Sequence, residues 1–153
     1  MSHKISKKIA IGLLLPVFVV ILFVVVIYIF GSDQAHLSVA KCETHFATYN
    51  VIEKNINNKK TKLLVADTET KRNYGLMNIK SKKEICGNDG MIFVFDNPGI
   101  QNFWNQNTLV DLKLYWMLGD KILRSDDLQN ITDNGMKIYS SILPVNRVVE
   151  LLK

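Results

Sequence analysis

The stretch of residues 90–108 places the strictest limits on how this chain can fold. Five apolar residues at 91–95 follow Gly90 and are closed by an Asp-Asn-Pro-Gly sequence at 96–99. A short apolar run between chain-breaking residues predicts a strand that is buried on both faces and ends in a turn. Because each aromatic side chain can bury roughly 150–250 Å², we expect four of them to form the centre of a folded core: Phe93, Phe95, Phe103 and Trp104.

The second constraint is an uncharged apolar segment at residues 9–30, which three lysines precede. A helix of this length spans about 33 Å and matches a hydrocarbon core of about 30 Å. The sequence therefore predicts a transmembrane helix at 9–30 after a cytoplasmic basic flank at 1–8, with the remainder periplasmic or extracellular. A cleaved signal peptide is the alternative, although its apolar region is usually only about 7–15 residues long and ends at small residues.

The charge of the chain argues against one class of partner. The sequence has 19 Lys and Arg against 14 Asp and Glu, and three of the lysines lie in the basic flank. The remaining 16 against 14 leave a nearly balanced domain, which lacks the basic surface that nucleic-acid binding requires. The chain beyond residue 30 is long enough for one domain and too short for two. We divide it into a post-membrane segment at 31–60 and a β-domain at 61–153.

Short strands dominate the pattern of the outward part. Apolar and polar residues alternate from Val110 to Leu118, which is typical of a strand with one buried face, and Gly119 fits the first position of a two-residue hairpin. A brief helix is predicted with Asp67 or Thr68 as its N-cap and Gly75 at its end. Further short strands are expected at 46–52, 61–66, 136–139 and 147–152, with a turn at 133–135. This pattern predicts a mainly β fold, a compact β-sandwich or barrel with one short helix.

Five motifs occur in a fixed order along the chain. They are Ala66-Asp67-Thr68, Gly75-Leu76-Met77, the run at 90–95, Phe103-Trp104 with Asn107-Thr108-Leu109, and Val149-Glu150-Leu151. Together they resemble the domain of unknown function 192 family over about residues 61–152. The resemblance implies a compact, mostly β fold that is often exported or membrane-anchored and has no established activity.

Several positions depart from the pattern of that family. Tyr74 and Ile79 stand where the family usually has Arg, Asn105-Gln106 replaces Met-Lys after the Trp, and Leu112-Lys113 replaces Leu-Asp. The apolar and glycine framework is kept while charged positions differ. A family function that depends on those charges would therefore be lost here.

The two cysteines, Cys42 and Cys86, both follow the predicted membrane segment. In an oxidising compartment they could form one disulfide that ties the post-membrane segment to the loop before the core strand. Two unpaired cysteines are the alternative, because spacing alone does not fix the geometry.

Metal binding and nucleophilic catalysis receive little support. Only Cys42 and His45 form a short ligand pair, and no second pair completes a zinc site with His36 and Cys86. A Cys42–His45 nucleophile would need a third group to orient the base, and no motif supplies one. Adjacent residues such as Asp126-Asp127 point to opposite faces of a strand, so these acids read as a solvated turn. We therefore assign no catalytic residue, metal or other cofactor.

One polar cluster remains as a candidate binding site. Trp104 is followed closely by Asn107 and Thr108, whose amide and hydroxyl beside an indole edge could bind a sugar or a peptide. The alternative is that these side chains tie down backbone groups in a loop. Asp67 and Arg72, at the two ends of the predicted helix, could face the same pocket.

The sequence thus predicts a membrane-anchored domain that binds an envelope protein or a small ligand. A different class of function is an envelope enzyme whose cleft is formed by Asp67, Arg72, Asn107 and Thr108. A third reading is a tethered scaffold in which only the membrane helix and its partners matter.

Overall fold

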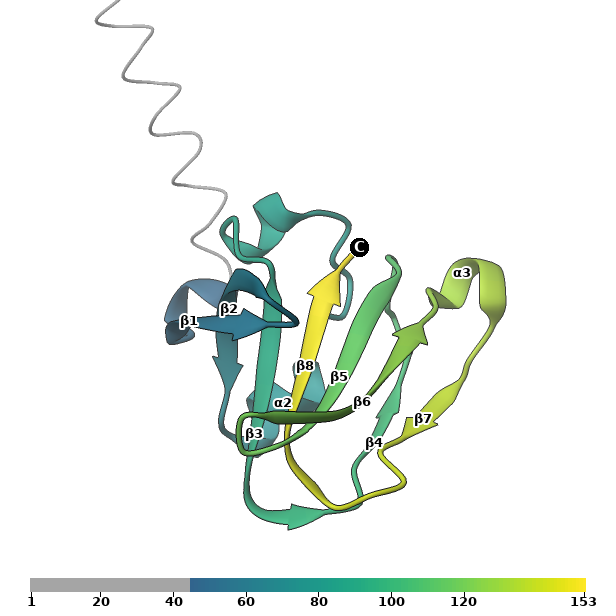
Figure 1. Ribbon diagram of the computed structural model, residues 1–153. Helices are drawn as coiled ribbons and strands as arrows, with labels where there is room; N and C mark the ends of the chain where they lie inside the picture. Colours follow the sequence, from purple (N-terminus) through teal and green to yellow (C-terminus); the bar gives the residue numbers. More distant parts are fainter. Residues whose placement is uncertain (1–44) are drawn as a thin grey trace, which may run out of the picture. The chain divides into compact units, whose positions relative to one another are not determined.

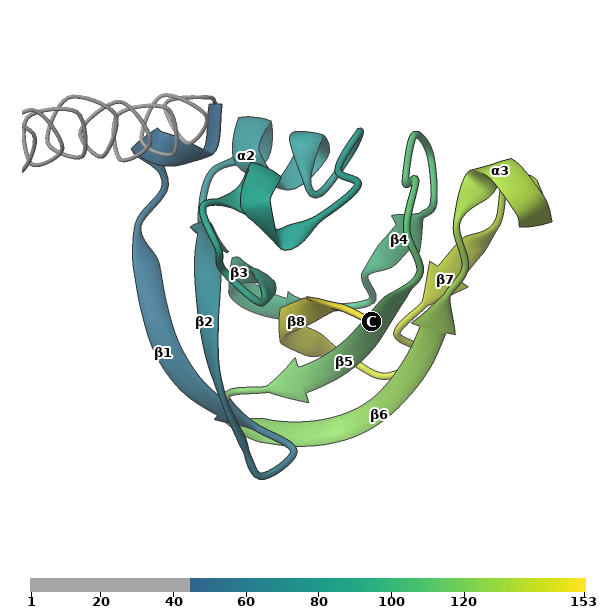
Figure 2. The ribbon, with the colours of Figure 1, turned by 90° about the horizontal axis from the view of Figure 1, so that it is seen from above.

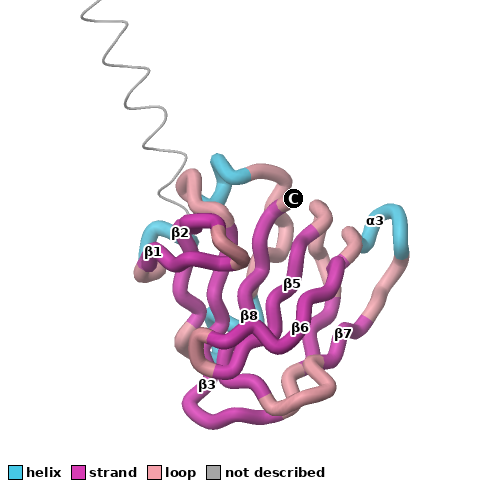
Figure 3. Tube along the Cα trace, in the orientation of Figure 1, coloured by secondary structure: helices cyan, strands magenta, loops and turns pink. Residues whose placement is uncertain are grey.

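The computed structural model describes residues 45–153, which fall within one compact unit (Figures 1 and 3). The basic flank, the predicted transmembrane helix at 9–30, His36 and Cys42 lie outside the described residues. Within residues 45–153, no helix is long and apolar enough to cross a membrane.

One six-stranded sheet organises the described part of the chain. Its strand order is β1-β2-β3-β8-β5-β6, and a separate two-stranded ribbon joins β4 to β7. Strands β2 and β3 run parallel, and the other neighbours are antiparallel. The bounds are β1 (Val51–Ile56), β2 (Lys59–Ala66), β3 (Gly90–Gly99), β4 (Asn102–Trp104), β5 (Leu112–Leu118), β6 (Lys121–Leu128), β7 (Ile138–Ser140) and β8 (Val145–Leu152).

The predicted mainly β class is confirmed, but the prediction of a sandwich or barrel is wrong. The sheet curves strongly (Figure 2) and does not close, because β1 pairs only with β2 and β6 only with β5. The terminal strand β8 is inserted in the middle of the sheet, between β3 and β5. A series of short strands cannot reveal this order, because pairing between strands far apart in sequence leaves no local pattern.

The predicted short helix is confirmed as α2 (Glu69–Tyr74). Its N-cap is Thr68, whose Oγ1 accepts a hydrogen bond from the backbone N–H of Lys71 at 3.3 Å. Gly75 follows with φ of 53°, a left-handed value that glycine adopts without steric cost. The hairpin at Gly119 is also confirmed, since Leu118 pairs with Lys121 and Gly119 has φ of 58°.

Three local predictions are corrected. The strand expected at 46–52 begins only at Val51, because a 3-10 helix, η1 (His45–Thr48), precedes it. The turn expected at 96–99 is part of β3, which continues through a register irregularity to Gly99. The turn expected at 133–135 is the end of a one-turn helix, α3 (Ile131–Asn134). A further 3-10 helix, η2 (Lys82–Ile85), lies in the loop before β3.

Apolar side chains are buried on both faces of the sheet. One face carries the larger cluster, which includes Phe93 and Trp116, while Ile92, Met117 and Val149 belong to a smaller cluster on the other face. Residues 91–93 of β3 are therefore buried on both faces as predicted, whereas Val94 and Phe95 are only half-buried and residues 96–98 are exposed. Trp104 departs from the expected core, because it is 47 % exposed on the two-stranded ribbon, and Trp116 is the buried tryptophan.

Gly90 brings β3 into unusually close contact with β8. A Cβ atom at this position would lie 1.8 Å from the carbonyl oxygen of Glu150, so no other residue fits without moving the backbone. The close approach sets the register in which Met91 lies opposite Glu150. This register places a carboxyl group in the apolar centre of the sheet.

Candidate functional site

Glu150 lies on the central strand β8 between two apolar neighbours. Met91 of β3 and Leu114 of β5 are its register partners, and the residue is only 5 % exposed. Burial raises the pKa of the Glu150 carboxyl to about 8, because the apolar surroundings disfavour the charged form. Within residues 45–153, no hydrogen bond or ion pair reaches this side chain. At neutral pH Glu150 is therefore mainly an uncharged carboxylic acid.

A cavity of about 200 Å³ adjoins Glu150 on the face that carries the larger core cluster. Its walls combine aromatic side chains with a polar edge that includes Gln101, Asn102, Gln106 and Thr108. The aromatic lining residues are Tyr74, Phe93, Phe95, Phe103 and Trp104. A concave site with apolar walls and a few polar groups is the usual form of a small-ligand site.

Phe103 of β4 joins the cavity wall to the core. Its ring lies edge-on to Phe93, with centroids 4.8 Å apart, and edge-on to Trp116 at 5.6 Å. Edge-to-face pairs of this kind are the favoured arrangement of aromatic rings. The contacts hold β4, whose residues line the cavity, against the sheet.

Arg72 places a positive charge at the cavity. Its Nη1 donates a hydrogen bond to the backbone oxygen of Val94 at 2.9 Å, and the centre of the guanidinium lies 5.1 Å from the Phe95 ring centroid. A hydrogen bond and a cation–π contact together fix the guanidinium against β3. Arg72 and Glu150 are the two acidic or basic residues that line the cavity.

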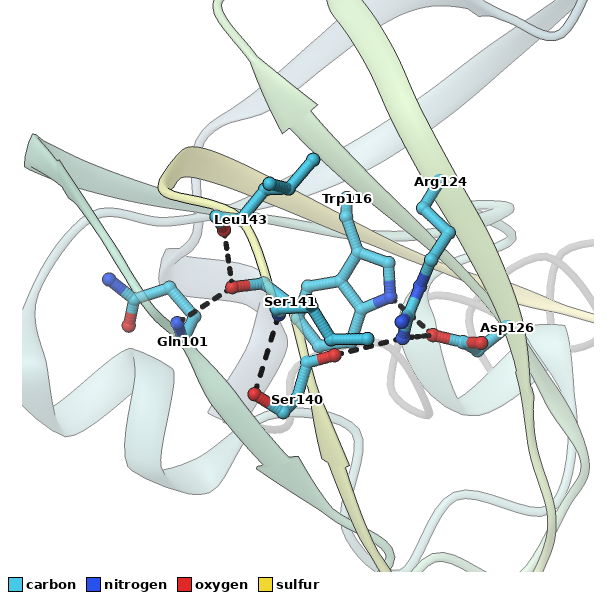
Figure 4. A network of polar contacts seen from close by, with 8 residues as sticks. Gln101, Trp116, Arg124, Asp126, Ser140, Ser141 and Leu143 are labelled. Atoms are coloured by element: carbon cyan, nitrogen blue, oxygen red, sulfur yellow. Dashed lines mark hydrogen bonds and ion pairs between the residues drawn. The ribbon is translucent and has the colours of Figure 1, made fainter.

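A separate polar network anchors the ribbon that carries the cavity wall (Figure 4). The indole N–H of Trp116 donates to Asp126 Oδ2 at 2.6 Å, and the guanidinium of Arg124 contacts the same carboxylate. Arg124 also donates to the backbone oxygen of Ser140 on β7 at 2.8 Å. Ser141 continues the network, since its Oγ accepts from the backbone N–H of Gln101 at 3.1 Å.

This network corrects the interpretation of Asp126-Asp127 as a solvated turn. Both residues lie on β6. Asp126 is half-buried, and Asp127 is exposed and forms ion pairs with Lys113 and Lys153. The two acids do not share partners, as expected for neighbours on a strand.

The predicted ligand-binding residues divide into two groups. Trp104, Arg72 and Thr108 line the same cavity. Asp67 forms an ion pair with Lys71 at 2.7 Å, and this hydrogen bond is the main cause that lowers the pKa of Asp67. Asn107 is exposed, has φ of 53°, and donates to the sulfur of Met77 at 3.8 Å. The four residues of the predicted enzyme cleft therefore do not converge on one point.

The cysteine and histidine candidates have other surroundings. Cys86 is disulfide-bonded, and Cys42 lies outside the described residues. His45 hydrogen-bonds to the Tyr49 hydroxyl at 2.8 Å and packs against the Tyr74 ring. Across residues 45–153, no group of three or more His, Cys, Asp or Glu side chains is arranged to hold a metal ion.

Sequence reasoning did not identify Glu150 as a site residue. The signal was present, because Glu150 is the one acid in a terminal strand that is otherwise apolar at positions 148–152. The apolar pattern around this position predicts a buried core strand and does not single out the acid. Only the register with Met91 and Leu114 shows that the carboxyl is buried beside a cavity.

The fold and cavity define a small, mainly β domain with a partly apolar site. The family model DUF192 (Uncharacterized ACR) matches residues 51–153, and the chain belongs to this family. A search of curated proteins finds no match.

Two crystal structures resemble the described domain. One is a proposed transcription regulator from Sinorhizobium meliloti 1021, with a TM-score of 0.53 and 23 % identity over 68 % of this chain and 81 % of that one. The other is a protein of unknown function from Novosphingobium aromaticivorans DSM 12444, with a TM-score of 0.47 and 16 % identity over 72 % and 86 %. The first likeness shows a shared fold and nothing about function.

Proposed function

We propose that this chain is a membrane-anchored, extracytoplasmic domain that binds a small ligand, or a protruding group of an envelope protein, in the cavity beside Glu150. The observation that carries the proposal is a buried carboxyl that adjoins a cavity and has no partner within residues 45–153. Buried polar groups are normally hydrogen-bonded. The Glu150 oxygens are not among the fully enclosed side-chain atoms that lack a partner within residues 45–153, so they are accessible from the cavity. A ligand that supplies the missing partner explains why such a residue is present.

The proposed location rests on two further features. The uncharged run at 9–30 behind three lysines fits a membrane anchor with an outward domain. Cys86 is disulfide-bonded, and disulfides persist mainly in oxidising compartments. Both features support a site that is open to the envelope.

The size of the cavity limits its occupant. At about 200 Å³ it is smaller than the roughly 300–1,000 Å³ of pockets that enclose drug-sized ligands. The cavity therefore suits a compact molecule or a single side chain of a partner. Trp104, which is 47 % exposed at the rim, can cover part of such a ligand.

A fragment screen tests the proposal. The full-length chain, purified in detergent, would be screened by ligand-observed NMR against single-ring aromatic compounds with different head groups. We expect hits that bind the wild type and bind Trp104→Ala at least fivefold more weakly.

Ile138→Ala is the matched control. Ile138 is the cross-strand partner of Trp104 on the same ribbon, is 68 % exposed, and does not line the cavity. Its substitution should leave binding unchanged. A screen without hits, or hits that Ile138→Ala weakens as much as Trp104→Ala does, would rule out the cavity as a ligand site.

A second candidate function is favoured by the pKa of Glu150. A carboxyl that titrates near pH 8 is well matched to general acid or base catalysis, and perturbed groups beside cavities are enriched at active sites. An enzyme would convert a bound compound into a product. Binding without conversion, retained in Glu150→Gln, supports the binding domain, whereas conversion that this variant abolishes supports the enzyme.

A further inference from the structure

The charge of the cavity points to the chemistry of its ligand. Among the residues that line it, only Arg72 and Glu150 are acidic or basic. The guanidinium of Arg72 carries a positive charge. Glu150 is uncharged at neutral pH because burial raises its pKa to about 8. The lining therefore carries one positive charge and no compensating negative charge.

The guanidinium of Arg72 is held in place and has no described carboxylate within salt-bridge distance, although the charge of Asp67 acts on it from further away. Within the described part of the chain it has one hydrogen bond, to the backbone oxygen of Val94, and it faces the Phe95 ring. The salt bridges present at residues 45–153 do not include Arg72, and the adjacent Lys71 is the partner of Asp67. A guanidinium has five N–H donors, so it can still bind an anion.

We propose that the cavity binds a small organic carboxylate with an apolar body, whose anionic end pairs with Arg72 and whose body lies among the aromatic walls. This rests on the proposed ligand-binding function and specifies its ligand class. The neutral Glu150 contributes an O–H donor and avoids the repulsion that an ionised carboxylate would exert. The polar edge at Gln101, Asn102 and Thr108 offers further hydrogen-bond donors.

The arrangement predicts that binding depends on pH. When Glu150 ionises, it adds a negative charge beside the bound carboxylate, and like charges in a poorly solvated site repel. The other groups around Glu150 do not account for this pH dependence. Strands β3 and β5 present the apolar Met91 and Leu114, and Asp126 on β6 is paired with Arg124. Tyr74 is the remaining titratable residue at the cavity.

Three probes with the same ring and different head groups test the proposal: benzoate, benzyl alcohol and benzylamine. Their affinities for the full-length chain in detergent would be measured by NMR titration at pH 7 and pH 9. Benzoate should bind at pH 7 at least tenfold more tightly than either other probe. Between pH 7 and pH 9 its affinity should fall about tenfold, which follows from a single ionisation near pH 8.

Four variants separate the roles of the residues. Arg72→Gln should abolish the preference for benzoate. Lys71→Gln removes a positive charge from the same helix but at a residue that does not line the cavity, so the preference for benzoate should remain. Glu150→Gln keeps a neutral donor, so it should bind benzoate at pH 7 and lose less than twofold at pH 9. Tyr74→Phe should keep the wild-type pH dependence.

The outcomes distinguish this inference from the proposed function. If benzyl alcohol or benzylamine binds as tightly as benzoate and Trp104→Ala weakens it, the cavity binds ligands but the carboxylate assignment is wrong. The assignment is equally wrong if Arg72→Gln and Lys71→Gln have the same effect, or if Glu150→Gln shows the wild-type alkaline loss. If no probe binds and the fragment screen also gives no hits, both proposals fail.

Discussion

Two carboxyl groups on the same face of the sheet have opposite surroundings. Glu150 and Asp126 are the two register partners on either side of Leu114. Asp126 accepts hydrogen bonds from Trp116 and Arg124 (Figure 4), whereas Glu150 has no such partner within residues 45–153 and adjoins a cavity. Asp126, whose hydrogen bonds are made, connects the sheet to the ribbon. Glu150 remains able to form hydrogen bonds with a ligand. The difference separates a structural carboxyl from a candidate functional one.

The largest expected effect is on the stability of Glu150→Gln in alkaline solution. The pKa of Glu150 is raised from 4.5 to about 8 in the fold, so stability falls as pH rises through this range and stays low above it. The shift corresponds to a loss on the order of 5 kcal/mol. The free energy of unfolding of the variant should exceed that of the wild type by about that amount at pH 9, and the two should differ little at pH 4. Urea unfolding at the two pH values measures this, and an equal difference at both would contradict it.

Asp126→Ala should destabilise the domain, whereas Glu150→Gln should stabilise it. It removes the acceptor of two hydrogen bonds and leaves the half-buried Arg124 without its anion, which should cost about 2–3 kcal/mol at pH 7. Asp127→Ala, at the adjacent exposed position, should destabilise the domain much less than Asp126→Ala, because surface ion pairs contribute little. Urea unfolding compares the two variants. Equal losses would show that the network in Figure 4 has no special role.

Phe103→Leu tests the residue that connects the two regions. Its ring contacts Phe93 on the cavity side and Trp116 on the network side. Leucine keeps most of the apolar contact but loses the edge-to-face geometry, so the expected loss is about 1 kcal/mol. Urea unfolding at pH 7 measures it, and an unchanged midpoint would show that the ring pairs do not fasten β4 to the sheet.

Asp67→Asn should have the smallest effect. The ion pair joins Asp67, an exposed residue that precedes the N-cap of α2, to Lys71, so its loss should cost no more than about 0.5 kcal/mol. Because Asp67 does not line the cavity, the benzoate affinity should not change. A weakened affinity, measured by the same titration, would show that Asp67 contributes to ligand binding.

Local features of this fold could be predicted from the sequence, and long-range ones could not. The cap at Thr68, the end of α2 at Gly75 and the hairpin at Gly119 follow from side-chain chemistry within a few residues. The insertion of β8 between β3 and β5 depends on pairing between residues 30 to 61 positions apart, from Met117 with Arg147 to Gly90 with Leu151, which no periodicity encodes.

The same distinction explains the candidate site. Trp104, Arg72 and Thr108 were predicted from polar and aromatic residues near helix ends and loops, and all three line the cavity. Glu150 was missed because its importance comes from its neighbours on two other strands. Asp67 and Asn107 do not line the cavity. Asp67 pairs with Lys71, and Asn107 donates to the sulfur of Met77, which is itself a lining residue.

The most direct test is the titration of the Glu150 carboxyl itself. Carboxyl ¹³C NMR of the full-length chain in detergent, assigned by comparison with Glu150→Gln, would follow this group from pH 4 to pH 10. A buried acid with no partner inside the domain should titrate near pH 8. A midpoint between pH 4 and pH 5 would show that the carboxyl is solvated or paired, and would remove the basis for a ligand site beside it.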